Sequence, residues 1–225
     1  MKNFKILIPA FLALFFVGCA QPKVYDYSAL QSAKPKSILV LMPTNETTEV
    51  KGAAAVLANS VAPLSEAGYY VFSPALVNDT FKANGVYEAD DIAKISLDKL
   101  RDIFGADAIL YLHIDRYGAN YKLINSSTEV GVNATLKDAK TGATLWQKYF
   151  LAVQNSNDSS SGGGLGGLLA NVIIAAIAQV ANDVGDAAYD LSGPAMFSLL
   201  GQNCNDCLLY GPKSPYFGQD KQLTK

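Results

Sequence analysis

The ten residues DAILYLHIDR, from Asp107 to Arg116, decide the fold. Successive side chains of a β-strand point to opposite faces, so this stretch predicts a strand with two distinct sides. Leu110, Leu112 and Ile114 share one side, and Ile109, Tyr111, His113 and Asp115 share the other. The stretch also marks a change in the chain: helices alternate with strands before it, and strands follow one another after it.

The segment before this strand predicts alternating strands and helices. The aliphatic run SILVLM, residues 37–42, is typical of a strand buried on both faces. The expected elements are, in chain order, strand 37–42, helix 50–64, strand 69–72, helix 86–95 and helix 97–104. Pro63 lies inside the first helical pattern and is expected to kink or restart that helix. A β-α-β-α-β order favours right-handed crossovers and therefore parallel strands.

The segment after the strand predicts an antiparallel hairpin and a long helix. Residues 128–136 and 143–153 alternate in polarity, and KDAKTG (137–142) between them has the residue types of a turn. Residues 155–167 have the composition of a flexible Gly/Ser loop. Residues 168–191 carry the apolar stripe of a long C-terminal helix.

Together these patterns predict an α/β fold with a mixed sheet flanked by helices. One domain is expected over residues 37–212, followed by a C-terminal tail at 213–225. The 225 residues, half of them apolar, suffice for one globular domain and exclude intrinsic disorder. A net charge of −2 and only two arginines argue against a nucleic-acid-binding protein, which needs a basic face.

The first eighteen residues have the features of a bacterial signal peptide. Lys2 and Lys5 precede an uncharged run that is shorter than a membrane-spanning helix requires. The run ends in FVGC, residues 16–19, which resembles a lipobox, the site where a lipoprotein precursor is cleaved before an acylated cysteine. The sequence therefore predicts that residues 1–18 are removed and that Cys19 carries the lipid.

An acylated Cys19 would anchor the protein in a lipid bilayer. Ala20 follows it, where an aspartate would retain a lipoprotein in the inner membrane, so the resemblance implies sorting to the outer membrane. Residues 19–36 mix proline, lysine and polar side chains and are expected to form a tether. We therefore predict a lipid-anchored protein at the periplasmic face of the outer membrane.

Cys204 and Cys207 form a second feature, in the sequence CNDC near the C-terminus. In an oxidising compartment we expect a small local disulfide that pins the C-terminal segment. The spacing also suits half of a zinc site, but zinc would need two more ligands, and His113 is the only histidine. A redox motif is a further alternative, although such a pair normally lies near the start of a βαβ unit.

Few residues of the chain stand in catalytic patterns. His113 and Asp115 share a strand side with Tyr111 and suggest an acid–base pair, but no G-x-S-x-G nucleophile turn accompanies them. A histidine among apolar strand residues is more often a hydrogen-bonded structural group. A formal G-x-G-x-x-G at residues 162–167 follows a serine-rich stretch rather than a strand. We therefore expect no enzymatic activity, no cofactor and no metal.

Four motifs resemble a bacterial lipoprotein family known as domain of unknown function 799. They are GYYVFSP (68–74), GADAILYLHI (105–114), DAKTGATLW (138–146) and LLYGP (208–212). The resemblance covers roughly residues 35–212 and implies a fold similar to the TolB N-terminal domain. Relatives of that fold include LpoB, which activates a peptidoglycan synthase, and the periplasmic part of CsgG, the curli secretion lipoprotein. Because family members are often encoded beside a CsgG-like lipoprotein, the resemblance implies a periplasmic partner and no catalytic residues.

Three classes of function follow as hypotheses. The first is a non-enzymatic accessory lipoprotein that binds a periplasmic or outer-membrane protein, such as a CsgG-like channel or a peptidoglycan synthase. Late aromatic residues are its candidate contact anchors: Tyr117, Tyr121, Trp146, Tyr149, Tyr210, Tyr216 and Phe217. The second is a homo-oligomeric subunit of an envelope complex that assembles through the glycine-rich loop and the long helix. The third is a glycan-binding or small-ligand-binding module. Tyr111, His113 and Asp115 are the candidate ligand or partner face.

Overall fold

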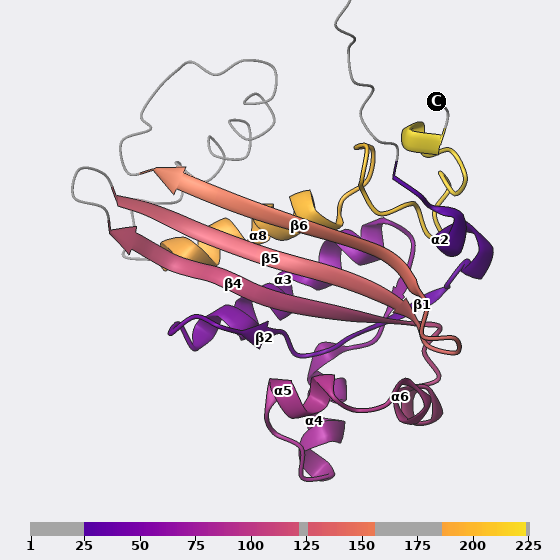
Figure 1. The fold of residues 1–225 in the computed structure, drawn as a ribbon, viewed down its shortest axis with the longest axis horizontal. Helices are drawn as coiled ribbons and strands as arrows, with labels where there is room; N and C mark the ends of the chain where they lie inside the picture. The colour runs from indigo at the N-terminus through magenta and orange to yellow at the C-terminus, as the bar shows by residue number, and fades with distance from the viewer. Residues whose placement is uncertain (1–24, 122–125, 156–185, 224–225) are drawn as a thin grey trace, which may run out of the picture.

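A six-stranded mixed sheet forms the centre of the computed structural model, which describes residues 25–121, 126–155 and 186–223. The strands lie in the order β3 (Tyr70–Val71), β1 (Ser37–Val40), β4 (Ala108–Tyr121), β5 (Ser126–Asp138) and β6 (Thr144–Asn155), and β2 (Thr44–Asn45) pairs with β4 further along. β1 pairs in parallel with β3 and β4, whereas β4, β5 and β6 are antiparallel. The predicted α/β class with a mixed sheet is confirmed (Figure 1).

Several predicted features fall outside the described residues. They are the signal peptide at 1–18, the acylated Cys19, residues 156–167 of the Gly/Ser loop and residues 168–185 of the long helix. Its last part is described as helix α8 (Ala187–Leu200). Among the described residues, no helix has both the length and the apolar character needed to cross a membrane.

β4 has the two-sided character that its sequence predicts. Leu110, Leu112 and Ile114 are buried in the larger of two apolar cores, and Ile109 is buried in the smaller core on the other side. A register shift between Ile114 and Arg116 leaves Asp115 without a partner residue on β5. This bulge turns two successive side chains to the same side and bends the strand.

The turn between β5 and β6 follows the predicted turn chemistry. The Asp138 carboxylate accepts hydrogen bonds from the backbone N–H groups of Lys140, at 3.0 Å, and Thr141, at 2.6 Å. Gly142 has a φ of +74°, which a residue without a Cβ adopts at low cost. β5 extends two residues beyond the predicted range at each end, whereas β6 begins one residue later and ends two residues later than predicted.

Helices cover the two faces of the sheet unequally. α3 (Lys51–Glu66) and α8 pack against each other and against one face, over the whole β4–β6 hairpin region. α4 (Pro74–Ala83), α5 (Ala89–Ala93) and α6 (Leu97–Phe104) pack on the other face, and only at the end next to β1 (Figure 1). Among residues 25–121, 126–155 and 186–223, no helix covers the remainder of that second face.

Two helical predictions differ from the structure. The helix at 50–64 does not restart at Pro63, because α3 continues to Glu66 and the Pro63 carbonyl accepts the Ala67 N–H at 3.0 Å. Pro63 lies in the last turn, where its missing N–H interrupts only one bond of an almost finished helix. The expected elements include no helix between strand 69–72 and helix 86–95, whereas α4 occupies 74–83 with Pro74 in its first turn, where a proline has no helical N–H bond to lose.

The two chain ends pack together at one corner of the domain. Helix α2 (Ser28–Ala33) lies inside the segment 19–36 predicted to be a tether, yet Tyr27 and Leu30 are buried in the larger core. Residues 25–36 therefore belong to the folded part. The tail also packs, since Ser214, Asp220 and Gln222 are buried and η2 (Lys221–Leu223) adds a turn of 3₁₀ helix. A tether prediction remains for residues 19–24 alone.

Candidate functional site

The uncovered part of the second sheet face is the candidate site, and we call it the open face. It consists of the outward side chains of β4, β5 and β6 from Tyr111, which packs at the border of the smaller apolar core, to the strand ends beyond α4–α6. They are Tyr111, His113, Asp115 and Arg116 on β4, Glu129, Gly131, Asn133 and Thr135 on β5, and Gln147, Tyr149, Leu151 and Val153 on β6. The structure thus brings the predicted Tyr111, His113 and Asp115 together on one face and adds residues from two neighbouring strands.

Three large side chains on β6 give the open face an apolar strip. Tyr149, Leu151 and Val153 alternate along the strand and are 47%, 38% and 38% exposed. A single exposed apolar residue needs no explanation, but a row of three on a regular strand is unusual for a surface facing water. β6 is also the edge strand of the sheet, so the strip lies at the margin of the open face.

The predicted acid–base pair is divided between two separate hydrogen-bonded groups. The His113 Nδ1 lies 2.8 Å from the Thr44 hydroxyl, and its Nε2 lies 3.3 Å from the Glu46 carboxylate. Asp115 instead accepts a hydrogen bond from the Tyr149 hydroxyl at 3.1 Å. His113 is therefore a structural group that links β2 to β4, and the third predicted residue, Tyr111, contacts Lys137 with its ring.

Gly131 makes room for the contact between Asp115 and Tyr149. A Cβ at this position would lie 2.4 Å from the Asp115 Oδ1 and 2.9 Å from the Tyr149 Oη. Burial raises the pKa of Tyr149, and the neighbouring Asp115 carboxylate raises it further. The phenol therefore stays protonated at neutral pH and remains a hydrogen-bond donor on the open face.

A buried carboxylate, Glu129, holds the far end of the open face together. It accepts hydrogen bonds from Asn120 at 3.1 Å, from Ser127 at 3.0 Å and from Arg116 at 3.3 Å. Burial opposes its ionisation, but these three donors outweigh the burial and lower the pKa of Glu129 below its ordinary value. The negative charge is thus permanent at neutral pH and fixes Arg116 beside Asp115.

We predict that E129Q lowers the free energy of unfolding by about 1–2 kcal/mol at pH 7, since a charged acceptor is lost from three hydrogen bonds. A lowered folded pKa contributes stability that is present above the unfolded pKa of about 4.3 and lost as pH falls through the folded pKa. The difference in the free energy of unfolding between wild type and E129Q should therefore become smaller as the pH is lowered from 5 to 3. Urea denaturation at both pH values measures it, with the exposed Glu66→Gln as control. A difference independent of pH would contradict the assignment.

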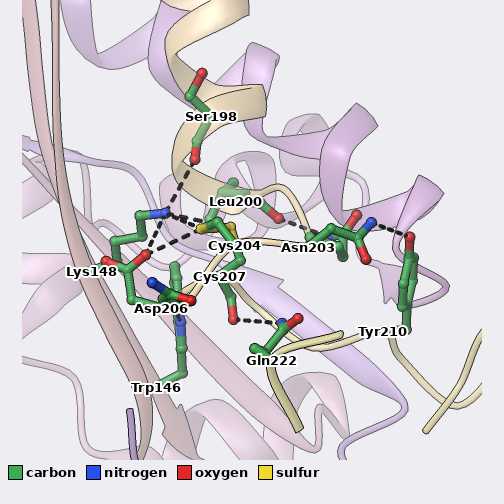
Figure 2. Close-up of a disulfide and its surroundings, with 12 residues drawn as sticks. Trp146, Lys148, Ser198, Leu200, Asn203, Cys204, Asp206, Cys207, Tyr210 and Gln222 are labelled. Atoms are coloured by element: carbon green, nitrogen blue, oxygen red, sulfur yellow. Dashed lines mark hydrogen bonds and ion pairs between the residues drawn. A yellow bond between two sulfur atoms is a disulfide. The ribbon is translucent and has the colours of Figure 1, made fainter. Parts of the chain in front are cut away.

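A second cluster surrounds the disulfide between Cys204 and Cys207 (Figure 2). The Trp146 indole donates to the Asp206 carbonyl at 2.9 Å, and the Tyr27 hydroxyl and the Gln222 amide both donate to the Cys207 carbonyl. The loop is therefore held by β6, by the N-terminal segment and by the tail. While the sulfurs are joined, they are not the thiolate ligands that the alternative zinc site requires.

Sequence patterns missed several residues of these two sites. Tyr149 was proposed only as one of seven aromatic anchors, of which Trp146 and Tyr117 are instead buried in the core. Arg116 and Glu129 belong to no sequence motif that would have marked them as site residues. Lys148 was missed as well, although it stands on the inward side of β6 between Trp146 and Phe150. A lysine at an inward strand position is a signal of a buried charge with a nearby partner.

Comparison with known proteins supports the lipoprotein assignment. The family model described as "Putative lipoprotein GNA1162-like" matches residues 25–213. The chain belongs to this family. A curated relative from Neisseria meningitidis, "Putative lipoprotein NMB1124/NMB1162", is 39% identical over 213 residues, which is 95% of this chain and 97% of the relative. Membership of a lipoprotein family confirms the resemblance inferred from the four motifs.

Among solved structures, that of lipoprotein GNA1162 shares the fold. The crystal structure of lipoprotein GNA1162 from Neisseria meningitidis is 44% identical, with a TM-score of 0.54, and covers 66% of this chain and 100% of that chain. The C-terminal domain of LpoB from Escherichia coli is 19% identical, with a TM-score of 0.36, and covers 54% of this chain and 85% of its own. The LpoB similarity is too remote to carry an argument about function.

Proposed function

We propose that this protein is a non-enzymatic lipoprotein, anchored in the outer membrane through acylated Cys19 and facing the periplasm, that binds another protein of an envelope assembly. The open face is its binding surface. The observation that carries this proposal is the exposed strip of Tyr149, Leu151 and Val153 beside the polar groups of β4. Protein interfaces combine apolar anchor side chains with neighbouring polar groups.

The chemistry of the open face restricts the partner. The Arg116 guanidinium has N–H donors beyond its contact with Glu129, and the Asp115 carboxylate and the Tyr149 hydroxyl oxygen, whose proton is donated to Asp115, offer acceptors beside an apolar strip. A protein surface with exposed aliphatic or aromatic side chains and a few polar groups matches this set. A CsgG-like channel or a peptidoglycan synthase remains the partner class that the family resemblance suggests.

Site-specific photo-crosslinking in intact cells tests the proposal. A photoreactive phenylalanine analogue at Val153 should capture one envelope protein, and the same analogue at Leu76, which is 68% exposed on α4, should not. L151K should reduce capture from position 153 at least tenfold, whereas L76K should leave it unchanged. Equal capture from both positions, or none from either, would overturn the open face as a binding surface.

Self-assembly through strand β6 is a second candidate, because β6 is an edge strand. The Gln147 N–H points away from β5 and donates to the Tyr25 hydroxyl at 2.8 Å, so the N–H groups of Tyr149, Leu151 and Val153 point outward too. Such an edge can pair with a strand of a second copy. L151P removes one outward donor, so it should abolish a discrete oligomer measured by mass in detergent. A lone monomer for the wild type would exclude this candidate.

A further inference from the structure

The side chain of Lys148 ends on the disulfide, although it is only 9% exposed. Its Nζ lies 3.2 Å from the Cys204 Sγ, 3.6 Å from the Cys207 Sγ and 3.5 Å from the Ser198 carbonyl oxygen (Figure 2). The Asp206 carboxylate, 53% exposed, lies 3.1 Å from the same Nζ. Burying an ammonium group costs free energy, and a neutral disulfide returns little of it. The same ammonium group would stabilise a thiolate strongly.

We propose that Cys204 and Cys207 form a thiol–disulfide exchange site in which Lys148 stabilises the thiolate that reduction releases. The co-reactant is a dithiol, either a dithiol protein of the same compartment or a small-molecule dithiol. Its two sulfurs lose two electrons and become a disulfide, and the Cys204–Cys207 bond gains those two electrons. The two protons of the dithiol are transferred to the two cysteines. Where a cysteine is a thiolate at the ambient pH, its proton goes to the solvent instead.

The difference in exposure between the two sulfurs determines which of them an incoming thiolate attacks. Cys207 is 4% exposed, whereas Cys204 is half-buried, so an incoming thiolate reaches the Cys204 sulfur. Attack there forms a mixed disulfide with Cys204 and breaks the bond to Cys207, whose sulfur leaves as a thiolate. The second thiol of the reductant then attacks the mixed disulfide and frees Cys204.

Charges around the sulfurs favour the same leaving group. The Cys204 sulfur has the Lys148 ammonium and the Asp206 carboxylate both at 3.2 Å, so their effects on a Cys204 thiolate oppose each other. The Cys207 sulfur has the ammonium at 3.6 Å and, among the described residues, no hydrogen-bond contact with a carboxylate. A thiolate is therefore better stabilised at Cys207, and the carboxylate of Asp206 is placed to accept a hydrogen bond from a Cys204 thiol.

Redox equilibration of the full-length lipidated protein tests the proposal. After equilibration with mixtures of reduced and oxidised dithiothreitol, alkylation and peptide mass spectrometry give the reduced fraction of Cys204 and Cys207. K148M keeps an unbranched side chain but removes the charge, so it should disfavour the reduced form about tenfold, or about 30 mV. K148R should stay within about threefold of wild type, and the exposed Lys140→Met should not differ from it.

The rate of alkylation provides a readout that does not depend on the lysine variants. In C204S the remaining Cys207 thiol should react with iodoacetamide along a pH profile whose midpoint lies well below the ordinary thiol pKa of about 8.5. An ordinary midpoint in C204S, or a K148M equilibrium within twofold of wild type, would show a purely structural disulfide and overturn the proposal. A denatured K148M would leave the C204S profile as the deciding measurement.

Discussion

W146A should lower the free energy of unfolding by about 3–5 kcal/mol, the largest loss that we expect from a single substitution in the sheet. Trp146 is fully buried in the larger core, where it packs under α8 and beside the N-terminal segment. Its indole also holds the Asp206 carbonyl, so the substitution removes both packing and a hydrogen bond to the disulfide loop. Urea denaturation followed by circular dichroism measures the loss, since Trp146 is the only tryptophan.

The neighbouring Gln147 provides the matched control for Trp146. Its side chain is exposed on the opposite side of β6, and its contact with Tyr25 uses only the backbone N–H. Q147A should therefore change the free energy of unfolding by less than about 0.5 kcal/mol. A loss below about 1 kcal/mol for W146A would mean that the core around it is not packed as described.

G68A should lower the free energy of unfolding by about 2–4 kcal/mol, because two separate costs add. Gly68 has a φ of +90°, where a Cβ is strained, and the added Cβ would lie 2.3 Å from the Ser214 backbone nitrogen. The Gly68 and Ala67 carbonyls accept hydrogen bonds from Lys213 and Gly211, so the tail cannot move aside without losing them. Denaturation experiments and limited proteolysis of the tail should both report the change.

G85A separates the two costs. Gly85 has a φ of +79°, but a Cβ there would meet no atom within 4 Å. This variant should lose only the conformational part, about 1–2 kcal/mol. If G68A and G85A were equally destabilised, the contact with Ser214 would contribute nothing, and the tail would not be fixed at Gly68.

Elements with a regular pattern were predictable from the sequence, and the short irregular ones were not. β4, β5 and β6 alternate over many residues, and the turn at Asp138–Gly142 has a characteristic composition. α4 buries only Val77 and Phe81, and the segment 25–36 around α2 buries Tyr27, Leu30 and Pro35. So few buried positions give no recognisable period, and therefore no helix was expected at 74–83 and the composition of residues 19–36 favoured a tether.

Only some features of the candidate sites could be predicted from the sequence, for a related reason. Alternation assigns Tyr149, Leu151 and Val153 to one side of β6, but it does not say whether a helix covers that side. The answer depends on where α4–α6 end, which is a property of the whole fold. Likewise, the CNDC sequence predicted the disulfide, whereas the approach of Lys148 required the pairing of distant segments.

The corner where the two chain ends meet also determines how the molecule stands on a membrane. The strand β6 begins at this corner, beside α2, and the hairpin strands extend away from it for 12–14 residues (Figure 1). At about 3.3 Å per residue, that is a rigid arm of roughly 40 Å. Residues 19–24 span at most about 20 Å. With Cys19 acylated as proposed, a short connection joins the lipid to this longer arm. The far ends of β4, β5 and β6 therefore stay within a limited distance of the bilayer surface.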